Sequence, residues 1–259
     1  MIRRVLIGAA FVSLVVAQPG DSLDSALRLL NAGKYQESAD ILASYLEDNP
    51  NNAAAYRIQA IAEFMLGRSD SALAKMQRSI ELNPQQPDSF YYLGRLHFSK
   101  NRPLEALTAF QKALDLDPSS IRAMNHLGQT YEALGKFSEA EKAYRDAISL
   151  NDKSTKKSEW PSYNLGALYL SQGQAEQALP YLSQALAYKP DFVEAKIKLG
   201  VGLAKTGEAA EARKVLEDAV HISPNNPEAH YRLGLLLMKS GMTKEAERHL
   251  EKFRQLTRR

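Results

Sequence analysis

A small residue recurs along most of this sequence at an interval of 34 residues, and this spacing limits the fold more than any other feature. The recurring residue is serine in the first copy and alanine in every later one. The copies are Ser38, Ala72, Ala106, Ala140, Ala178, Ala212 and Ala246. The interval is 34 residues except between Ala140 and Ala178, where it is 38. Recurrence at a fixed period of this length indicates stacked supersecondary units.

Each unit carries the pattern of two amphipathic helices. In the unit at residues 87–120, apolar residues recur with helical spacing from about Asp88 to Ser99 and again from about Leu104 to Leu116. The other units have a glycine between the two segments, and Asn101 takes its place in this one. Both residue types tolerate the left-handed conformation that ends a helix. Each unit is therefore predicted to form a helix hairpin, and the chain is predicted to be all-α.

The residues of these hairpins resemble the tetratricopeptide repeat, a helix-turn-helix unit of about 34 residues. In the third unit the matching residues are Leu93, Gly94, Ala106, Phe110, Ala113 and Pro118. The resemblance covers about residues 19–259 and implies a right-handed α-solenoid of tandem hairpins. It implies one solenoid domain over residues 18–259, with repeats near 19–52, 53–86, 87–120, 121–154, 159–192, 193–226 and 227–259 and an insertion near 155–158.

The joint between the fourth and fifth repeats has the sequence NDKSTKKSEWPSY. Lys153, Lys156 and Lys157 precede Trp160, the single tryptophan of the chain. One interpretation is a basic and aromatic contact for a partner. The other is a longer solvated loop whose tryptophan packs on the next helix, and we favour it because it needs no partner.

The amino terminus resembles a secretory signal peptide over residues 1–17. Arg3 and Arg4 precede an uncharged run from Val5 to Ala17, which is shorter than the roughly 20 residues that a membrane-spanning helix needs. We therefore expect cleavage after Ala17. The mature protein is expected outside the cytoplasm, in the periplasm of a Gram-negative host or secreted, with no stable membrane span. An uncleaved membrane anchor and a buried first helix are the alternatives.

Composition and motifs argue against catalysis. The chain has no cysteine, which excludes disulfides, thiol catalysis and cysteine-bound metals. Its histidines include no i, i+4 pair, and the glycines near Gly202 lack the lysine of a phosphate loop. We therefore expect no enzyme activity, no catalytic residue, no metal, no cofactor and no small-molecule substrate. The net charge of +3, two units of which come from Arg3 and Arg4, also argues against nucleic acid as a partner.

The resemblance implies a partner-binding surface, because in this family the first helix of each repeat lines a concave groove. We therefore expect a groove that binds a protein or peptide. The predicted groove residues are Arg57, Phe64, Tyr91, Arg95, Phe98, Arg122, Asn125, Gln129, Trp160, Tyr163, Asn164 and Lys198. Further first-helix positions are Ile61, Lys205, Tyr231 and Lys239. Aromatic residues and arginine are typical of binding hot spots, and Tyr91, Arg95 and Phe98 are not required by the repeat pattern.

A carboxylate clamp is not expected in this groove. Family members that grip chaperone C-terminal carboxylates use Lys and Asn, then Asn, then Lys and Arg on three successive first helices. The nearest window here has Asn125 and Gln129, then Asn164, then Glu194 and Lys198. Glu194 has the wrong charge for that role, so this window does not match the clamp.

The sequence therefore predicts a non-catalytic, exported scaffold that binds a protein or peptide in its concave groove. One alternative is an assembly factor of a cell-envelope machine, such as a pilus, a secretion system or cytochrome maturation. Another is a structural subunit that self-associates into an oligomer. All three functions depend on exposed surface and not on a reaction centre.

Overall fold

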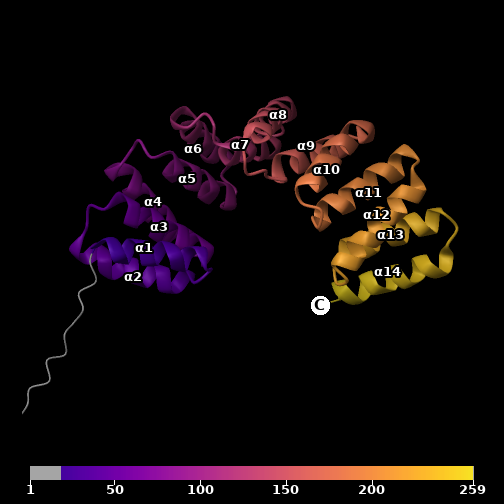
Figure 1. The fold of residues 1–259 in the computed structure, drawn as a ribbon, viewed down its shortest axis with the longest axis horizontal. Helices are drawn as coiled ribbons and strands as arrows, with labels where there is room; N and C mark the ends of the chain where they lie inside the picture. The colour runs from indigo at the N-terminus through magenta and orange to yellow at the C-terminus, as the bar shows by residue number, and fades with distance from the viewer. Residues whose placement is uncertain (1–18, 259) are drawn as a thin grey trace, which may run out of the picture. The chain divides into compact units, whose positions relative to one another are not determined.

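The computed structural model describes residues 19–258, with side chains from residue 22 onward. Within this range the chain forms fourteen helices and no strand, so the prediction of an all-α fold is confirmed (Figure 1). The predicted signal peptide at residues 1–17 lies outside the described residues, and its cleavage stays a prediction. The helices are α1 (Pro19–Asn31), α2 (Tyr35–Asp48), α3 (Ala53–Met65), α4 (Ser69–Leu82), α5 (Pro87–Ser99), α6 (Pro103–Leu116), α7 (Ile121–Ala133), α8 (Phe137–Lys153), α9 (Trp160–Ser171), α10 (Ala175–Tyr188), α11 (Val193–Thr206), α12 (Ala209–Ile222), α13 (Pro227–Lys239) and α14 (Thr243–Thr257).

Consecutive helices pack as hairpins, which join α1 to α2, α3 to α4, α7 to α8, α9 to α10, α11 to α12 and α13 to α14. The turn inside a hairpin contains a residue in the left-handed region. At the end of α11 this residue is Gly207, with φ of 92°. Asn101, with φ of 55°, is the one residue other than glycine with positive φ in the described part of the chain. The prediction that glycine or Asn101 ends each first helix is therefore confirmed.

Small residues lie where the two helices of a hairpin cross. A Cβ atom added at Gly200 would lie 2.5 Å from Leu216 Cγ, and one added at Gly128 would lie 2.5 Å from the Tyr144 ring. Contacts this short force the neighbouring side chain to move, at a cost of about 1–3 kcal/mol. The recurring small residues therefore allow each first helix to pack closely on its second helix.

The chain divides after Leu96 into two compact units. Unit 1 contains α1 to α4 and most of α5. Its buried residues form two clusters, one including Leu42 and Ile58 and the other including Met76 and Leu96. Because Leu42 lies on α2 and Ile58 on α3, the core of unit 1 joins neighbouring hairpins as well as the two helices of one hairpin.

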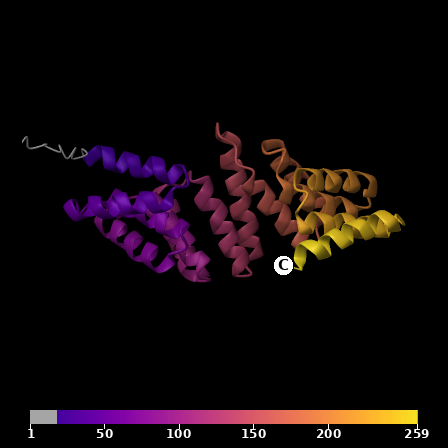
Figure 2. The ribbon, with the colours of Figure 1, turned by 90° about the horizontal axis from the view of Figure 1, so that it is seen from below.

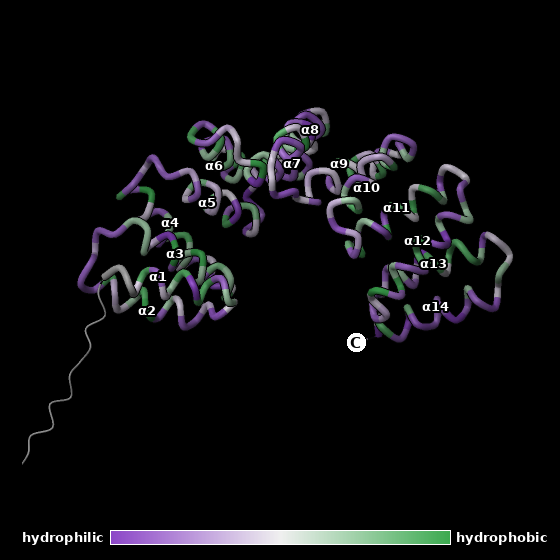
Figure 3. Tube along the Cα trace, viewed as in Figure 1, coloured by the Kyte–Doolittle hydropathy of each residue, from purple (hydrophilic) through white to green (hydrophobic). Residues whose placement is uncertain are grey.

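Unit 2 contains the end of α5 and the helices from α6 to α14. One buried cluster joins the helices from α8 to α14, and its large members include Tyr144, Tyr169, Leu182 and Leu216. Figure 3 shows hydrophobic residues interspersed with hydrophilic ones along these helices, as expected where each helix buries one face. The helices from α10 to α14 pack in chain order, each on the next, and Figure 2 shows this end of the chain in orange to yellow. Unit 2 is therefore an α-solenoid of stacked hairpins.

The insertion near residues 155–158 forms an ordered loop after α8. The buried side chain of Asn151 donates to the carbonyl of Ser158 at 2.9 Å and accepts from its N–H at 2.8 Å. Lys157 Nζ donates to the carbonyls of Asn151 and Asp152 at 3.0 and 2.6 Å. These carbonyls belong to the last turn of α8, where a cation is favourable. Lys157 therefore has a structural role in closing the helix.

Candidate partner-binding surface

All the predicted groove residues lie on the first helices of their hairpins. Arg57 and Phe64 lie on α3, Tyr91, Arg95 and Phe98 on α5, Arg122, Asn125 and Gln129 on α7, Trp160, Tyr163 and Asn164 on α9, and Lys198 on α11. Those up to Arg95 belong to unit 1, and those from Phe98 onward belong to unit 2. Each unit therefore presents its own first-helix surface.

In unit 1, aromatic rings surround Arg95. Its guanidinium carbon lies 5.1 Å from the ring centroid of Phe64, 5.9 Å from that of Tyr91 and 5.5 Å from that of Tyr92. Tyr91 is only 5% exposed, so little of its ring is available at the surface. These four residues, the Arg95 cluster, include Tyr92, which the sequence did not single out. A cation over aromatic rings is stabilised by their negative faces, so Arg95 already has favourable contacts inside the protein. Arg57, on α3, is half-buried.

In unit 2, Asn125 and Asn164 form a pair. Asn164 Nδ2 donates to Asn125 Oδ1 at 2.9 Å, and the two residues are 7% and 6% exposed, respectively. Buried amides are expected to be hydrogen-bonded, and this bond joins the first helices α7 and α9. The two side chains are therefore partners of each other, and a contact with another protein stays a prediction. Beside them, Arg122 is exposed and Gln129 is half-buried, as is Phe98 on α5.

Trp160 begins an aromatic cluster at the start of α9. Its ring lies edge-on to Phe192 at 5.0 Å and to Tyr163 at 5.8 Å between centroids, and Tyr163 and Phe192 are 4.9 Å apart. Burial raises the pKa of Tyr163, and the charges of Glu194 and Glu228 add to the shift. Trp160 is nevertheless 45% exposed, so it packs on the next hairpin and still presents part of its ring.

Phe192 was missed by the sequence reasoning. It is buried and lies at the N-cap position of α11, just outside the first helix on which the search for partner residues was based. Lys189 Nζ lies 5.3 Å from the Phe192 ring centroid and 3.5 Å from Glu159 Oε1. The sequence does contain a signal for this contact. Phe192 directly precedes the first helix of one hairpin, and Trp160 begins the first helix of the hairpin before it.

A hollow of about 230 Å³ lies between α11 and α13. It is called the α11–α13 hollow, and the residues that line it are Gly200, Val201, Ala204, Lys205, Leu216, Arg232, Leu235, Leu236 and Lys239. Small residues on α11 leave room above the core, and Leu235 is 43% exposed. Lys205 and Lys239 lie in the last turns of their helices. Lys198 is half-buried on α11 and does not line the hollow.

Arg232 is a further lining residue that the sequence reasoning did not name. It lies on α13 at the position equivalent to Lys198, 34 residues earlier. Its Nη2 lies 3.3 Å from Glu228 Oε1, and its guanidinium carbon lies 5.5 Å from the Tyr231 ring centroid. Adding one repeat length of 34 residues to Lys198, a predicted groove residue, would have identified Arg232.

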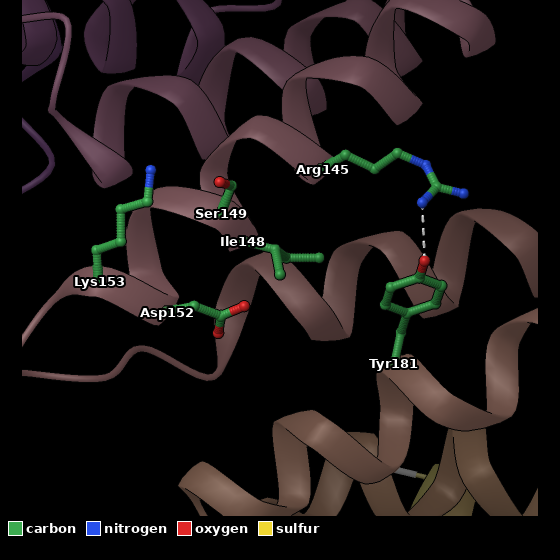
Figure 4. A pocket seen from close by; sticks show the side chains of 6 residues that line it. All are labelled: Arg145, Ile148, Ser149, Asp152, Lys153 and Tyr181. Carbon is green, nitrogen blue, oxygen red and sulfur yellow. Dashed lines mark hydrogen bonds between the residues drawn. The ribbon is translucent and has the colours of Figure 1, made fainter.

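A second hollow, of about 330 Å³, lies on the opposite face, between the second helices α8 and α10. Figure 4 shows the residues that line it, which are Arg145, Ile148, Ser149, Asp152, Lys153 and Tyr181. The Arg145 guanidinium donates to Glu141 at 2.9 Å, to the Tyr181 hydroxyl at 2.9 Å and to the Tyr169 hydroxyl at 2.7 Å. Each of its three nitrogens donates to a side chain on α8, α9 or α10, so we assign Arg145 to joining these helices.

The same network perturbs the acid–base properties of its members. The Tyr169 hydroxyl donates to Glu141 at 2.7 Å, and this hydrogen bond lowers the pKa of that carboxyl. Burial, followed by the Glu141 contact, raises the pKa of Tyr169 to about 12. Tyr169 therefore stays protonated, and Glu141 stays charged, over the physiological range. Groups held in one protonation state suit a structural contact better than proton transfer.

His230 and His249 form a contact between α13 and α14. Their Nδ1 atoms are 3.0 Å apart, and His230 Nε2 lies 3.0 Å from the Pro224 carbonyl. Because that carbonyl requires a donor, His230 Nδ1 is the acceptor and His249 Nδ1 donates to it. Burial and the neighbouring His230 lower the pKa of His249. Residues 19–258 contain no cluster of three or more His, Cys, Asp and Glu side chains that could bind a metal ion.

None of the described helices has both the length and the hydrophobicity needed to cross a membrane.

Comparison with known proteins identifies the family. A tetratricopeptide repeat model matches residues 23–87 and 163–227, together half of the chain. The chain belongs to the tetratricopeptide repeat family. A second tetratricopeptide repeat model matches residues 203–255, and a model of subunit 3 of the anaphase-promoting complex, or cyclosome, matches residues 65–147.

Solved structures of other tetratricopeptide proteins resemble this one. YrrB, described as a tetratricopeptide protein with an unusual peptide-binding site, is 25% identical with a TM-score of 0.56, covering 70% of this chain and 92% of its own. PilF of Pseudomonas aeruginosa is 18% identical with a TM-score of 0.71, covering 79% and 91%. The Cut9–Hcn1 assembly of the anaphase-promoting complex is 16% identical with a TM-score of 0.74, covering 90% and 45%. The likeness to PilF and Cut9–Hcn1 concerns the fold.

Proposed function

We propose that this tetratricopeptide protein is a non-catalytic scaffold whose first-helix face in unit 2 binds a protein or peptide partner. The observation that carries the proposal is that exposed large apolar side chains on first helices lie beside further apolar residues, with Trp160 against Tyr163 and Phe192 and Leu235 in the α11–α13 hollow. Second helices also expose Leu104 and Phe137, so exposure alone does not distinguish the two faces. Trp160 on α9 and Leu235 on α13 both remain more than two-fifths exposed. Burying such groups on binding is favourable at roughly 25 cal/mol per Å² of apolar area.

The opposite face supports the same choice. Arg145 donates to Glu141, Tyr169 and Tyr181. Asp152 accepts from the Tyr188 hydroxyl at 2.8 Å. Arg145 and Asp152 therefore offer less to a ligand than exposed groups without internal partners. Lys153 in the same hollow makes no hydrogen bond or ion pair with the described residues. The family and the likeness to YrrB, which is described as having a peptide-binding site, also favour a peptide or protein as the partner.

Export to an extracytoplasmic compartment is part of the proposal. It rests on the basic start and the short apolar run of residues 1–17. The test is the mass of the protein purified from its own host. A mature chain that begins at Gln18 agrees with export through a cleaved signal, and an intact Met1 contradicts it.

Site-specific photocrosslinking tests the binding face. A photoreactive amino acid is placed at Gln129 or Trp160, on first helices, and at Lys142 or Lys214, on second helices of the same unit. We expect a discrete adduct from the first two positions in the native host. The adduct is then identified, and the purified partner is titrated into the purified protein. Equal adducts from Lys142 and Lys214, or none from Gln129 and Trp160, contradict the proposal.

A further inference from the structure

Two lysines occupy equivalent positions in the last two hairpins. Lys205 and Lys239 are 34 residues apart and lie in the last turns of the first helices α11 and α13. The same position in the earlier first helices is uncharged. Its occupants there are Asn31, Met65, Ser99, Ala133 and Ser171. The positive charge is thus confined to one end of the repeat array and is not part of the repeat pattern.

The helix dipole explains only part of this arrangement. Cations near the last turn of a helix are favourable by about 0.3–1 kcal/mol, which accounts for a lysine at either position. It does not account for the exposed apolar surface beside them, where Val201 and Leu235 occupy a second pair of equivalent positions. Leaving a leucine 43% exposed on a helix face that packing could cover has a cost in free energy.

Lys205 and Lys239 have no acidic partner among the described residues. Their exposed side chains form no ion pair or hydrogen bond with the residues from 19 to 258. Neighbouring arginines differ, because Arg232 lies 3.3 Å from Glu228, and Arg213 lies 2.6 Å from Glu217. Lys205 and Lys239 are therefore available to acidic groups from outside, and among the unpaired cations of unit 2 they are the two that line the α11–α13 hollow.

The size of the hollow limits what can enter it. At about 230 Å³ it is smaller than the roughly 300–1,000 Å³ of sites that enclose a whole small ligand. Much of its lining is apolar and includes Val201, Ala204, Leu235 and Leu236, which suits one large apolar side chain. A nucleotide or a lipid headgroup would leave these apolar residues uncovered. A segment made only of acidic residues would leave them uncovered too.

We propose that the α11–α13 hollow binds a peptide segment in which one large apolar residue is flanked by glutamate or aspartate. The apolar side chain lies over Val201 and Leu235, and the acidic side chains pair with Lys205 and Lys239. This inference rests on the proposed function and names the chemistry of one subsite within it. The carboxylates come from side chains, so the segment can lie inside a partner chain and does not need a free C-terminus.

Titration of the full chain with capped peptides tests the proposal. The probes are twelve-residue glycine–serine peptides, acetylated and amidated, with a central Leu, Ile, Phe or Met flanked by glutamates. We expect at least one to bind, and we expect replacement of its glutamates by glutamine, or of its apolar residue by serine, to weaken binding about tenfold or more. A glutamine version with a free C-terminus tests the other source of a carboxylate. Equal binding of the glutamine peptide, free or capped, overturns the proposal, as does the failure of all four probes to bind.

Matched variants locate the site. Lys205→Gln with Lys239→Gln is expected to weaken binding about tenfold or more. Lys214→Gln with Lys244→Gln removes the same charge from the second helices of the same hairpins, and we expect less than a twofold change. Far-ultraviolet circular dichroism checks that both proteins are folded. Equal effects from the two double variants overturn the site.

The subsite and the proposed function can fail separately. If the partner captured at Gln129 and Trp160 binds the Lys205→Gln, Lys239→Gln protein as tightly as the natural one, the subsite is wrong and the first-helix function stands. If Gln129 and Trp160 capture nothing while the peptides bind and depend on the two lysines, the subsite stands and the wider surface assigned to α7 and α9 is wrong.

Discussion

The Arg95 cluster of unit 1 and the α11–α13 hollow of unit 2 both combine cations with apolar residues on first helices. They differ in what the cations already contact. Arg95 lies 5.1 to 5.9 Å from three aromatic ring centroids, whereas Lys205 and Lys239 have no acidic partner among the described residues. Equivalent helix faces can therefore differ in function, because a side chain that already has internal partners gains less from an external one.

The largest effect on stability is expected beneath the hollow. Gly200→Val places its Cβ atom 2.5 Å from Leu216 Cγ, so the Leu216 side chain must move or α11 and α12 must separate. We expect the free energy of unfolding to fall by about 3 kcal/mol, measured by urea denaturation. Val201→Ala, on the next residue, shortens a half-exposed side chain and is expected to change it by less than about 1 kcal/mol. Equal losses from the two variants would show that the floor of the hollow is not set by the close helix crossing.

The Asn125–Asn164 pair tests whether a predicted groove residue stabilises the fold through its internal hydrogen bond. Asn125→Ala leaves the buried Asn164 amide without its acceptor, and we expect a loss of about 2 kcal/mol in unfolding free energy. Asn125→Ala combined with Asn164→Ala is expected to lose less than the sum of the single variants, because no orphaned amide remains. Additive losses in this double-mutant cycle would contradict the pairing of the two amides.

Arg95 gives a direct contrast with Lys205. Arg95→Ala removes a cation from the faces of three rings, and we expect unfolding free energy to fall by about 1 kcal/mol. Lys205→Ala is expected to lower the unfolding free energy by only about 0.3 kcal/mol, the contribution of a cation at an exposed helix end, and to weaken peptide binding. The measurements are urea denaturation and peptide titration on the same two proteins. A larger stability loss for Lys205→Ala than for Arg95→Ala would reverse the comparison between the units.

The smallest effect is a pH dependence near α14. The pKa of His249 is lowered in the folded protein, by burial first, then by His230 and Arg213, while Glu217 and Glu245 oppose the shift. An unfolded chain therefore binds a proton at His249 more readily than the folded chain does. Stability is fully present above the ordinary histidine pKa of about 6.5, and it is lost as pH falls from there to the lowered folded value.

His249→Gln isolates this contribution. We expect the thermal midpoint of the natural protein to fall more steeply between pH 7 and pH 5 than that of the variant. His221→Gln, at an exposed histidine on α12, is the matched control and is expected to keep the natural slope. Parallel slopes for the natural protein and His249→Gln would show that the His230–His249 contact does not titrate in this range.

The hairpins could be predicted from sequence because each depends on local residues. The turn glycines, Asn101 and the small residues at helix crossings all recur at the repeat period, and the structure places them as expected. Contacts between neighbouring hairpins could not be predicted in the same way. The Asn125–Asn164 bond and the packing of Trp160 on Phe192 depend on how adjacent hairpins are rotated, which the period alone does not specify.

Methyl NMR of the full chain is the most direct test of the account, because it reports where a ligand binds. The titrant is the tightest of the capped peptides with an apolar residue between glutamates. We predict shifts at the methyl groups of Val201, Leu235 and Leu236, and none at Ile148, which lines the hollow between the second helices. Shifts at Ile148 with unchanged signals from Val201 and Leu235 would contradict binding on the first-helix face.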